Sequence, residues 1–430
     1  MTRIALPEVP LTTSVLQNGV TVVTAHLPHH PRAHVFVQLR GGPVHESDET
    51  WGLSHFVEHM VFRGTARHRD ARAVSLAADD FGGDVGAATY RDRVVFDTRC
   101  DPSRVVDALD LLAAMLGGPR FVGLAVEKAI IEEELAELYD DEGQEIDVDN
   151  AVFRQMFAGH VLSRSIEGTP EVLGAFDKRA VRALHAAFFG AQNLVLSVAG
   201  PLAHKQVVAH ARKTLGRLSA GSLPPAGVAP APSRERIVEV IRTDDAQTSV
   251  RLCFSAPGMK SPQAPALAVL GRLLDDGPAS RLQANVIDRD GLAYSVWAVA
   301  DLYEERGLIE LGSSVRHDRV AVLVEALVRE VVGLARRTPR AEEVHRVQQR
   351  YARDARDLLD DPASVAEAAG KGAVFGEPLD PGRSVRRVQA VRPASVQALA
   401  RRIFRQPRLV LVGLPSRQQV AQARDALCRL

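Results

Sequence analysis

Two histidines lie four residues apart in the segment His55-Phe56-Val57-Glu58-His59, and a glutamate directly precedes the second one. The surrounding apolar run from Trp51 to Phe62 predicts a helix, on which residues four apart share one face. Both imidazoles can therefore bind one metal ion, and the carboxylate would lie beside a metal-bound water. A His pair at this spacing can also be an ordinary surface or core pair, so the motif alone leaves both interpretations open.

A hydrolytic zinc site needs a third protein ligand, with the fourth position left to water. A second predicted helix offers five glutamates, namely Glu127, Glu132, Glu133, Glu134 and Glu137. Glu127 and Glu134 stand two turns apart on one face, alongside Ile130 and Ile131, and burying them would be costly without a metal or a hydrogen-bond donor. The alternative is a solvated acidic helix, which fits the other three glutamates better.

The stretch from Gly52 to Thr65 resembles the zinc motif of the pitrilysin and mitochondrial processing peptidase family, whose His-x-x-Glu-His order defines the inverzincin metallopeptidases. The resemblance continues along the chain and implies a bacterial single-chain enzyme of two domains. Five further stretches agree with the family in order: Asn18-Gly19 followed by 20–25, Gly82-Gly83 with Ala87 and Thr89, Glu127 to Glu134, Gly168-Thr169-Pro170-Glu171, and Ser280-Arg281-Leu282 with Gly291-Leu292-Ala293-Tyr294.

The resemblance also implies a role for each residue of the metal site. His55, His59 and Glu134 become the ligands of one zinc ion per chain, Glu58 the general base, and Glu127 a carboxylate that supports the site without binding the metal. The implied activity is a zinc-dependent endopeptidase that hydrolyses peptides or the leader segments of precursors.

The chain also contains an internal repeat. Its 430 residues exceed the size at which one core keeps growing, so two domains are expected. Apolar positions recur 215 residues later: Val181, Leu184, Phe189 and Leu194 return as Val396, Leu399, Phe404 and Leu409. We predict an α+β fold of two homologous domains, each a mixed sheet with helices on one side, at 1–216 and 236–430. The Pro-, Ala- and Gly-rich residues 217–235 form the linker.

Only the first half is expected to hold metal. The stretch that matches the metal helix in the second half, 264–274, has no His or carboxylate. The resemblance implies that the second half closes over the first as a clamshell and binds substrate. The peptide would be added as a strand beside a sheet edge.

Two positions depart from the family pattern. Active relatives usually place an Arg seven residues before the Tyr that contacts substrate, and here Ile287 precedes Tyr294 at that distance. Arg289 is close in sequence, but two residues along a helix is a turn of about 200°, so we expect it to point elsewhere. Gly86 stands where relatives commonly have Asn. By position in the family pattern, the resemblance implies Gly86, Ala87, Thr89 and Tyr294 as the substrate contacts.

Composition excludes several other classes of protein. Lys plus Arg and Asp plus Glu each total 53, so neither net charge nor a basic stripe favours nucleic acid. Apolar runs are too short to span a membrane, and residues 1–10 lack the apolar segment of a signal peptide. Cys100, Cys253 and Cys428 are scattered and odd in number, which favours free thiols and a cytoplasmic location.

Two hypotheses of function follow. The first is an active zinc endopeptidase, as a homodimer or as a heterodimer with a zinc-less relative that supplies an Arg and Tyr pair. The second is a non-catalytic or partner-dependent peptide-binding subunit of a processing complex. We favour the first, because such subunits typically lose the zinc motif, which is complete here.

Overall fold

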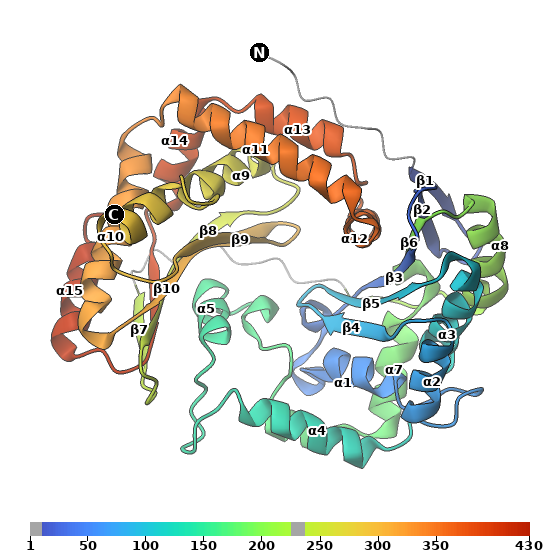
Figure 1. Cartoon of the computed structure of the whole chain (residues 1–430). Coiled ribbons are helices and arrows are strands. Elements are labelled where there is room, and N and C mark those ends of the chain that lie inside the picture. The colour runs from blue at the N-terminus through green and yellow to red at the C-terminus, as the bar shows by residue number, and fades with distance from the viewer. Residues whose placement is uncertain (1–10, 225–236) are drawn as a thin grey trace.

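The computed structural model describes residues 11–224 and 237–430, and these form two mixed β-sheets on opposite sides of the molecule (Figure 1). Most of the predicted linker, 225–235, lies outside the described residues. The N-terminal sheet has the order β1-β2-β6-β3-β5-β4, with bounds β1 Leu11–Val15, β2 Thr21–His26, β3 Ala33–Arg40, β4 Val85–Thr89, β5 Arg93–Cys100 and β6 Leu194–Gly200. The C-terminal sheet has the order β7-β11-β8-β10-β9, with bounds β7 Ile237–Ile241, β8 Thr248–Pro257, β9 Trp297–Leu302, β10 Arg306–Val315 and β11 Arg408–Val412.

The two sheets have the same topology, which confirms the internal repeat. In each sheet one pair of strands is parallel, β2 with β6 and β7 with β11, and the pairs that follow across the sheet are antiparallel. Only β1, which extends the N-terminal sheet, lacks a counterpart among the described strands. The helices repeat as well, because α7 begins at Lys178 and α14 begins at Pro393, 215 residues later.

Helices cover one face of each sheet, so the predicted α+β class is confirmed. In the N-terminal half they are α1 Leu53–Val61, α2 Ala71–Asp80, α3 Val105–Gly117, α4 Leu124–Ala136, α6 Pro170–Ala175, α7 Lys178–Phe188 and α8 His204–Thr214. In the C-terminal half they are α9 Ala264–Leu274, α10 Val320–Arg336, α11 Ala341–Asp360, α13 Pro381–Gln389, α14 Pro393–Ile403 and α15 Arg417–Leu427. The two largest apolar clusters lie between these helices and the sheets. As predicted, α9 has the place of α1 but carries no metal-binding side chain.

The opposite face of each sheet is covered by a helix from the other half. Helix α12, Pro362–Val374, packs on β2, β3 and β6 of the N-terminal sheet, and α5, Val148–Met156, packs on β8 and β11 of the C-terminal sheet. Strand β6 is therefore buried along its whole length, since successive side chains alternate between two covered faces. Helices α5 and α12 have equivalent positions in the internal repeat, and each packs on the sheet of the other half. Both helices lie between the halves (Figure 1).

Aromatic and polar contacts hold the exchanged helices in place. The rings of Phe153 on α5 and of Phe157, the residue that follows α5, make T-shaped contacts with the Tyr303 ring at centroid distances of 6.1 and 6.0 Å. The Arg91 guanidinium lies 3.7 Å from the Phe153 ring centroid. On the other side, the Gln38 Nε2 donates to the backbone oxygen of Glu367 on α12 at 2.8 Å. Each half thus completes the core of the other, and the halves are expected to unfold together.

The predicted absence of a disulfide framework agrees with the structure. Cys100 and Cys253 are buried free thiols, and Cys428 is an exposed one. Across residues 11–224 and 237–430, no helix combines the length and the apolar character needed to cross a membrane.

Candidate metal centre and active site

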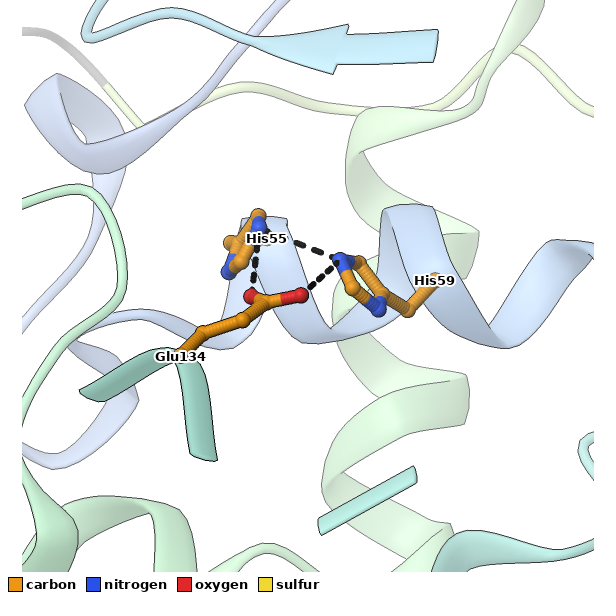
Figure 2. Close-up of side chains that lie close together, drawn as sticks. All are labelled: His55, His59 and Glu134. Carbon is orange, nitrogen blue, oxygen red and sulfur yellow. Dashed lines mark hydrogen bonds and ion pairs between the residues drawn. The ribbon is translucent and has the colours of Figure 1, made fainter. Parts of the chain in front are cut away.

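Helix α1 brings the two histidines and Glu58 together. Its apolar side chains, Phe56, Val57, Met60 and Val61, are buried in the core of the N-terminal half, which leaves the His55 and His59 face directed away from the sheet. The two Nε2 atoms are 3.2 Å apart, and both rings lie on one side of the helix (Figure 2). The four-residue spacing therefore produces the shared face that it predicts.

The start of α1 depends on a close approach of two glycines. Gly52 has a φ of 88°, and a Cβ on it would lie 2.4 Å from the carbonyl oxygen of Glu167. In return, a Cβ on Gly168 would lie 2.5 Å from the carbonyl oxygen of Trp51. Only glycine fits at these two positions. This contact explains why the stretch that begins at Gly168 accompanies the metal motif in the sequence.

A buried carboxylate that the sequence did not reveal caps α1. Glu46 accepts hydrogen bonds from the backbone N–H groups of Gly52 at 2.8 Å and Ser54 at 2.6 Å, where the helix has unpaired donors. Burial raises the pKa of Glu46 to about 7, and the hydrogen bonds from Ser54 and Gly52 oppose this only in part. No spacing signal links Glu46 to α1, because a separate short 3-10 helix, Asp48–Thr50, lies between them.

The raised pKa of Glu46 predicts a pH-dependent stability. Between about pH 4.5 and about pH 7, Glu46 is protonated in the folded chain and ionised in the unfolded chain. Protonation of Glu46 therefore stabilises the folded chain at low pH, and this stabilisation is lost as pH rises through 7. Relative to Glu46→Gln, the free energy of unfolding of the natural chain should increase by up to about 3 kcal/mol as pH falls across this range. Urea unfolding of both proteins at several pH values measures this difference, and a constant difference would contradict it.

Helix α4 supplies both predicted carboxylates to α1. Glu134 Oε2 lies 3.8 Å from His55 Nε2, and Glu134 Oε1 lies 3.8 Å from His59 Nε2, so one carboxylate faces both rings (Figure 2). Glu127 is buried and its Oε1 lies 2.8 Å from His59 Nδ1. Of the two isoleucines expected on this face, Ile131 is buried, but Ile130 is 40 % exposed, so the apolar stripe on α4 is narrower than predicted.

The second oxygen of Glu127 is paired with Arg63, which sequence reasoning missed. Arg63 follows His59 by four residues, so the helical spacing carried a signal that could have found it. Burial alone would raise the pKa of Glu127, but the hydrogen bonds from His59 and Arg63 reverse this and lower it. The buried carboxylate is therefore satisfied by two donors and stays charged.

The donor atoms of His55, His59 and Glu134 fit one zinc ion. All three residues offer an atom within 4.8 Å of the others, and among the described residues no other set of three His, Cys, Asp or Glu does so. In tetrahedral zinc, two nitrogens each about 2.05 Å from the metal are about 3.3 Å apart, close to the 3.2 Å between the Nε2 atoms.

The protonation state of His55 also suits a metal. Burial, followed by the nearby His59, lowers the pKa of His55 to about 3, so this imidazole is neutral and can donate a lone pair. Because the ring of His55 is buried and its Nδ1 has no partner within the described chain, its main polar interaction is at Nε2. Glu127 engages Nδ1 of His59, which orients that Nε2 toward Glu134 as well.

Glu58 contacts the neighbouring edge strand and is near enough to His59 and Glu134 for their charges to act on it. It is buried, and the Thr89 hydroxyl donates a hydrogen bond to its Oε2 at 3.2 Å. Burial raises the pKa of Glu58, which makes its carboxylate a stronger proton acceptor than an exposed one. Thr89 thus links the expected general base to β4.

The four predicted substrate-contact residues fall in two separate places. Gly86, Ala87 and Thr89 lie on β4, whose outer edge is unpaired among the described strands and lies beside α1. Tyr294 is fully exposed in the C-terminal half, where Gly291 and Arg316 line the same pocket. The described contacts do not join Tyr294 to the metal cluster.

An apolar side chain, Ile287, occupies the position where relatives usually have arginine. Ile287 is part of a short π-helical segment, Gln283–Arg289, and packs against the C-terminal core. Arg289 donates to the adjacent Asp290 at 2.7 Å and to Asn285, four residues earlier, at 2.9 Å. The Arg289 guanidinium is thus held by residues of its own segment.

Comparison with protein families gives two adjoining matches. The family described as "Insulinase (Peptidase family M16)" matches residues 21–170, which include both histidines and all the glutamates of the candidate centre. The family described as "Peptidase M16 inactive domain" matches residues 175–351, which include Ile287 and Tyr294.

Similar proteins cover nearly the whole chain. An uncharacterized zinc protease of Streptomyces coelicolor is 27 % identical over 424 residues, 96 % of this chain and 92 % of that protein. One of Bacillus subtilis is 26 % identical over 405 residues, 93 % and 97 % of the two chains. Among solved structures, a protease from Helicobacter pylori has a TM-score of 0.83 at 18 % identity, covering 94 % of this chain and 99 % of that one, which supports the fold.

Proposed function

The chain belongs to the insulinase (M16) family of peptidases, and on that premise we propose that it is a zinc-dependent endopeptidase with its catalytic centre on α1 and α4. The observation that carries the proposal is the convergence of His55, His59 and Glu134, from two helices, on one point. A fully solvated acidic helix would not place the Glu134 carboxylate 3.8 Å from the Nε2 atoms of both imidazoles. The geometry therefore favours a metal centre over an ordinary His pair.

We assign His55, His59 and Glu134 as the ligands of one zinc ion and Glu127 as the carboxylate that orients His59. A bound zinc ion would supply Lewis acidity, which polarises the scissile carbonyl and lowers the pKa of water toward neutrality. Glu58 would accept a proton from the attacking water at a carboxylate oxygen and then donate it to the leaving amine. The hydrogen bond from Thr89 to Oε2 would hold that carboxylate in place during both transfers.

Peptide substrates would bind as an added strand on the open edge of β4. An extended peptide can pair with the unpaired backbone groups of an edge strand, and its side chains then determine specificity. Thr89 lies at the end of β4 and contacts Glu58, so a peptide paired with this strand would run past the catalytic centre. In this arrangement Gly86, Ala87 and Thr89 are substrate contacts, and Tyr294 would approach from the C-terminal half.

The quaternary arrangement that we propose follows from Ile287. Ile287 cannot donate a hydrogen bond and Arg289 donates to Asp290, so neither residue supplies the guanidinium that relatives place seven residues before the Tyr. We propose that the enzyme works as a homodimer or as the catalytic subunit of a heterodimer with a zinc-less relative. We retain the domain bounds 1–216 and 236–430, with the linker 217–235, and the cytoplasmic location as predictions.

One experiment tests activity and partner dependence together. Zinc content and cleavage of a quenched peptide library are measured for the purified chain and for Ile287→Arg. One zinc per chain with cleavage by the natural chain means a self-sufficient peptidase. Zinc without cleavage, and activity that appears with Ile287→Arg or a partner subunit, means a catalytic half. A chain that takes up no zinc and cleaves nothing in either form would refute the proposal and favour a peptide-binding subunit.

A further inference from the structure

We infer that Asp97, reached across Gly86, forms a subsite that selects a basic side chain in the substrate. The inference rests on the proposed function, since it needs a peptide paired with the edge of β4. It assigns a specificity-determining carboxylate on β5, the strand behind that edge. Lysine and arginine are the substrate residues that such a subsite would accept.

The edge strand has a gap at Gly86, and Asp97 borders it. Gly86 and Asp97 are directly opposite each other in the register of β4 and β5. A Cβ on Gly86 would lie 2.8 Å from Asp97 Oδ1, so the Asp97 carboxylate leans into the space that a side chain would occupy. Gly86 has an ordinary backbone conformation, so what glycine provides here is space rather than a special turn.

Gly86 and Asp97 belong to a row of residues that lie opposite one another across the strands of the sheet. This row is covered at one end and open at the other. Behind Asp97 the row continues through Phe36 on β3 and Ser197 on β6. Helix α12 packs over those two strands, and Phe36 is buried there. Gly86 is exposed and Asp97 is half-buried, so the open end of the row faces the edge to which a peptide would be added.

The Asp97 carboxylate has no compensating cation. Within the described residues it makes no ion pair and accepts no hydrogen bond, although His34 is near enough to act on it weakly. Its other charged neighbours, Glu367 on α12 and Asp84, are also acidic. Burial and these two carboxylates raise the pKa of Asp97, which means that its charge is disfavoured until a cation approaches. A substrate ammonium or guanidinium group would supply that cation.

The geometry fits a long side chain from an added strand. The peptide residue opposite Gly86 would lie two inter-strand spacings, about 9.6 Å, from β5, in the same row as Gly86 and Asp97. A Lys or Arg stem can extend over Gly86 and place its charged end at the carboxylate, whereas short side chains cannot. Gly86 is three residues from Thr89, so this substrate residue lies about 10 Å along the peptide from the one opposite Thr89.

The test compares peptides that differ only in charge. An Arg is scanned through the positions on each side of the cleaved bond, and each peptide is paired with one that has neutral citrulline at that position. We expect kcat/KM for Arg over citrulline to be about 10- to 100-fold at one position. Asp97→Asn should bring that ratio close to one, and Asp97→Lys should favour a Glu peptide. Because the ratio is taken within each variant, effects common to both peptides cancel.

Controls separate this inference from the proposed function. Asp80→Asn, an exposed acidic residue at the end of α2, should keep the Arg preference. A ratio near one at every position in the natural chain, or a ratio that survives in Asp97→Asn, would overturn the inference while cleavage upholds the proposed function. If no peptide is cleaved, equilibrium binding of the same pairs to the chain and to Asp97→Asn decides the subsite by the same ratio.

Discussion

Replacing Glu58 with Gln is expected to lower kcat for peptide hydrolysis by about 10²- to 10⁴-fold without loss of zinc. Gln cannot accept the proton that the proposed reaction transfers. Its amide oxygen can still accept the hydrogen bond from Thr89, and Glu58 is not one of the three residues whose donor atoms converge. The effect should therefore be on chemistry and not on metal binding.

Zinc content by atomic spectroscopy and turnover of a quenched peptide measure these two quantities in the same sample. Glu133→Gln is a matched control, because Glu133 is an exposed glutamate on α4 beside the site. It should retain both zinc and activity. A Glu58→Gln protein that still turns over at the natural rate would show that another group serves as the base.

Replacing Glu134 with Ala is expected to remove both the metal and the activity. Only two imidazoles would remain on α1. Loss of a direct ligand should weaken zinc binding by more than the roughly 10- to 100-fold cost of losing a group that only orients a ligand. Activity should fall to background. The stabilisation that zinc gives the folded protein should disappear as well, and this is about 4 kcal/mol when zinc is present at 1,000 times its Kd.

Thermal unfolding with and without a chelator measures this loss. The natural chain should unfold at a lower temperature once zinc is removed and recover when zinc is restored, whereas Glu134→Ala should respond to neither treatment. Glu132→Ala, another exposed position on α4, should behave like the natural chain. Stoichiometric zinc in the Glu134→Ala protein would mean that a different residue completes the centre.

The features that were predictable from sequence are those governed by local backbone geometry. The spacing of His55 and His59 places them on one face because a helix turns once in 3.6 residues, and the same rule applies to Glu127 and Glu134. The internal repeat could be recognised in the sequence because buried positions alternate or recur with the period of their strand or helix. Equivalent positions in two copies of one fold therefore carry similar apolar residues.

The features that were missed depend on which segments meet in space. Glu46 caps α1 from outside any helical spacing, and the exchange of α5 and α12 cannot be read from their sequences, because an apolar helix face does not specify which sheet it covers. The exposure of Ile130 has the same origin, since α4 is in contact with other elements on only part of its surface. Each outcome requires the positions of residues far apart in the chain.

The sequence by itself predicted the shared face of His55 and His59 from helical spacing, the roles of the ligands and the base from the family resemblance, and the internal repeat from apolar positions that recur 215 residues apart. Only the tertiary structure decided that Glu134 meets both imidazoles, that Arg63 and His59 hold Glu127, and that Asp97 lies behind the gap at Gly86. The physical reason is that charge pairing, burial and strand register arise between segments separated in the chain. Their energies depend on distances that exist only after folding.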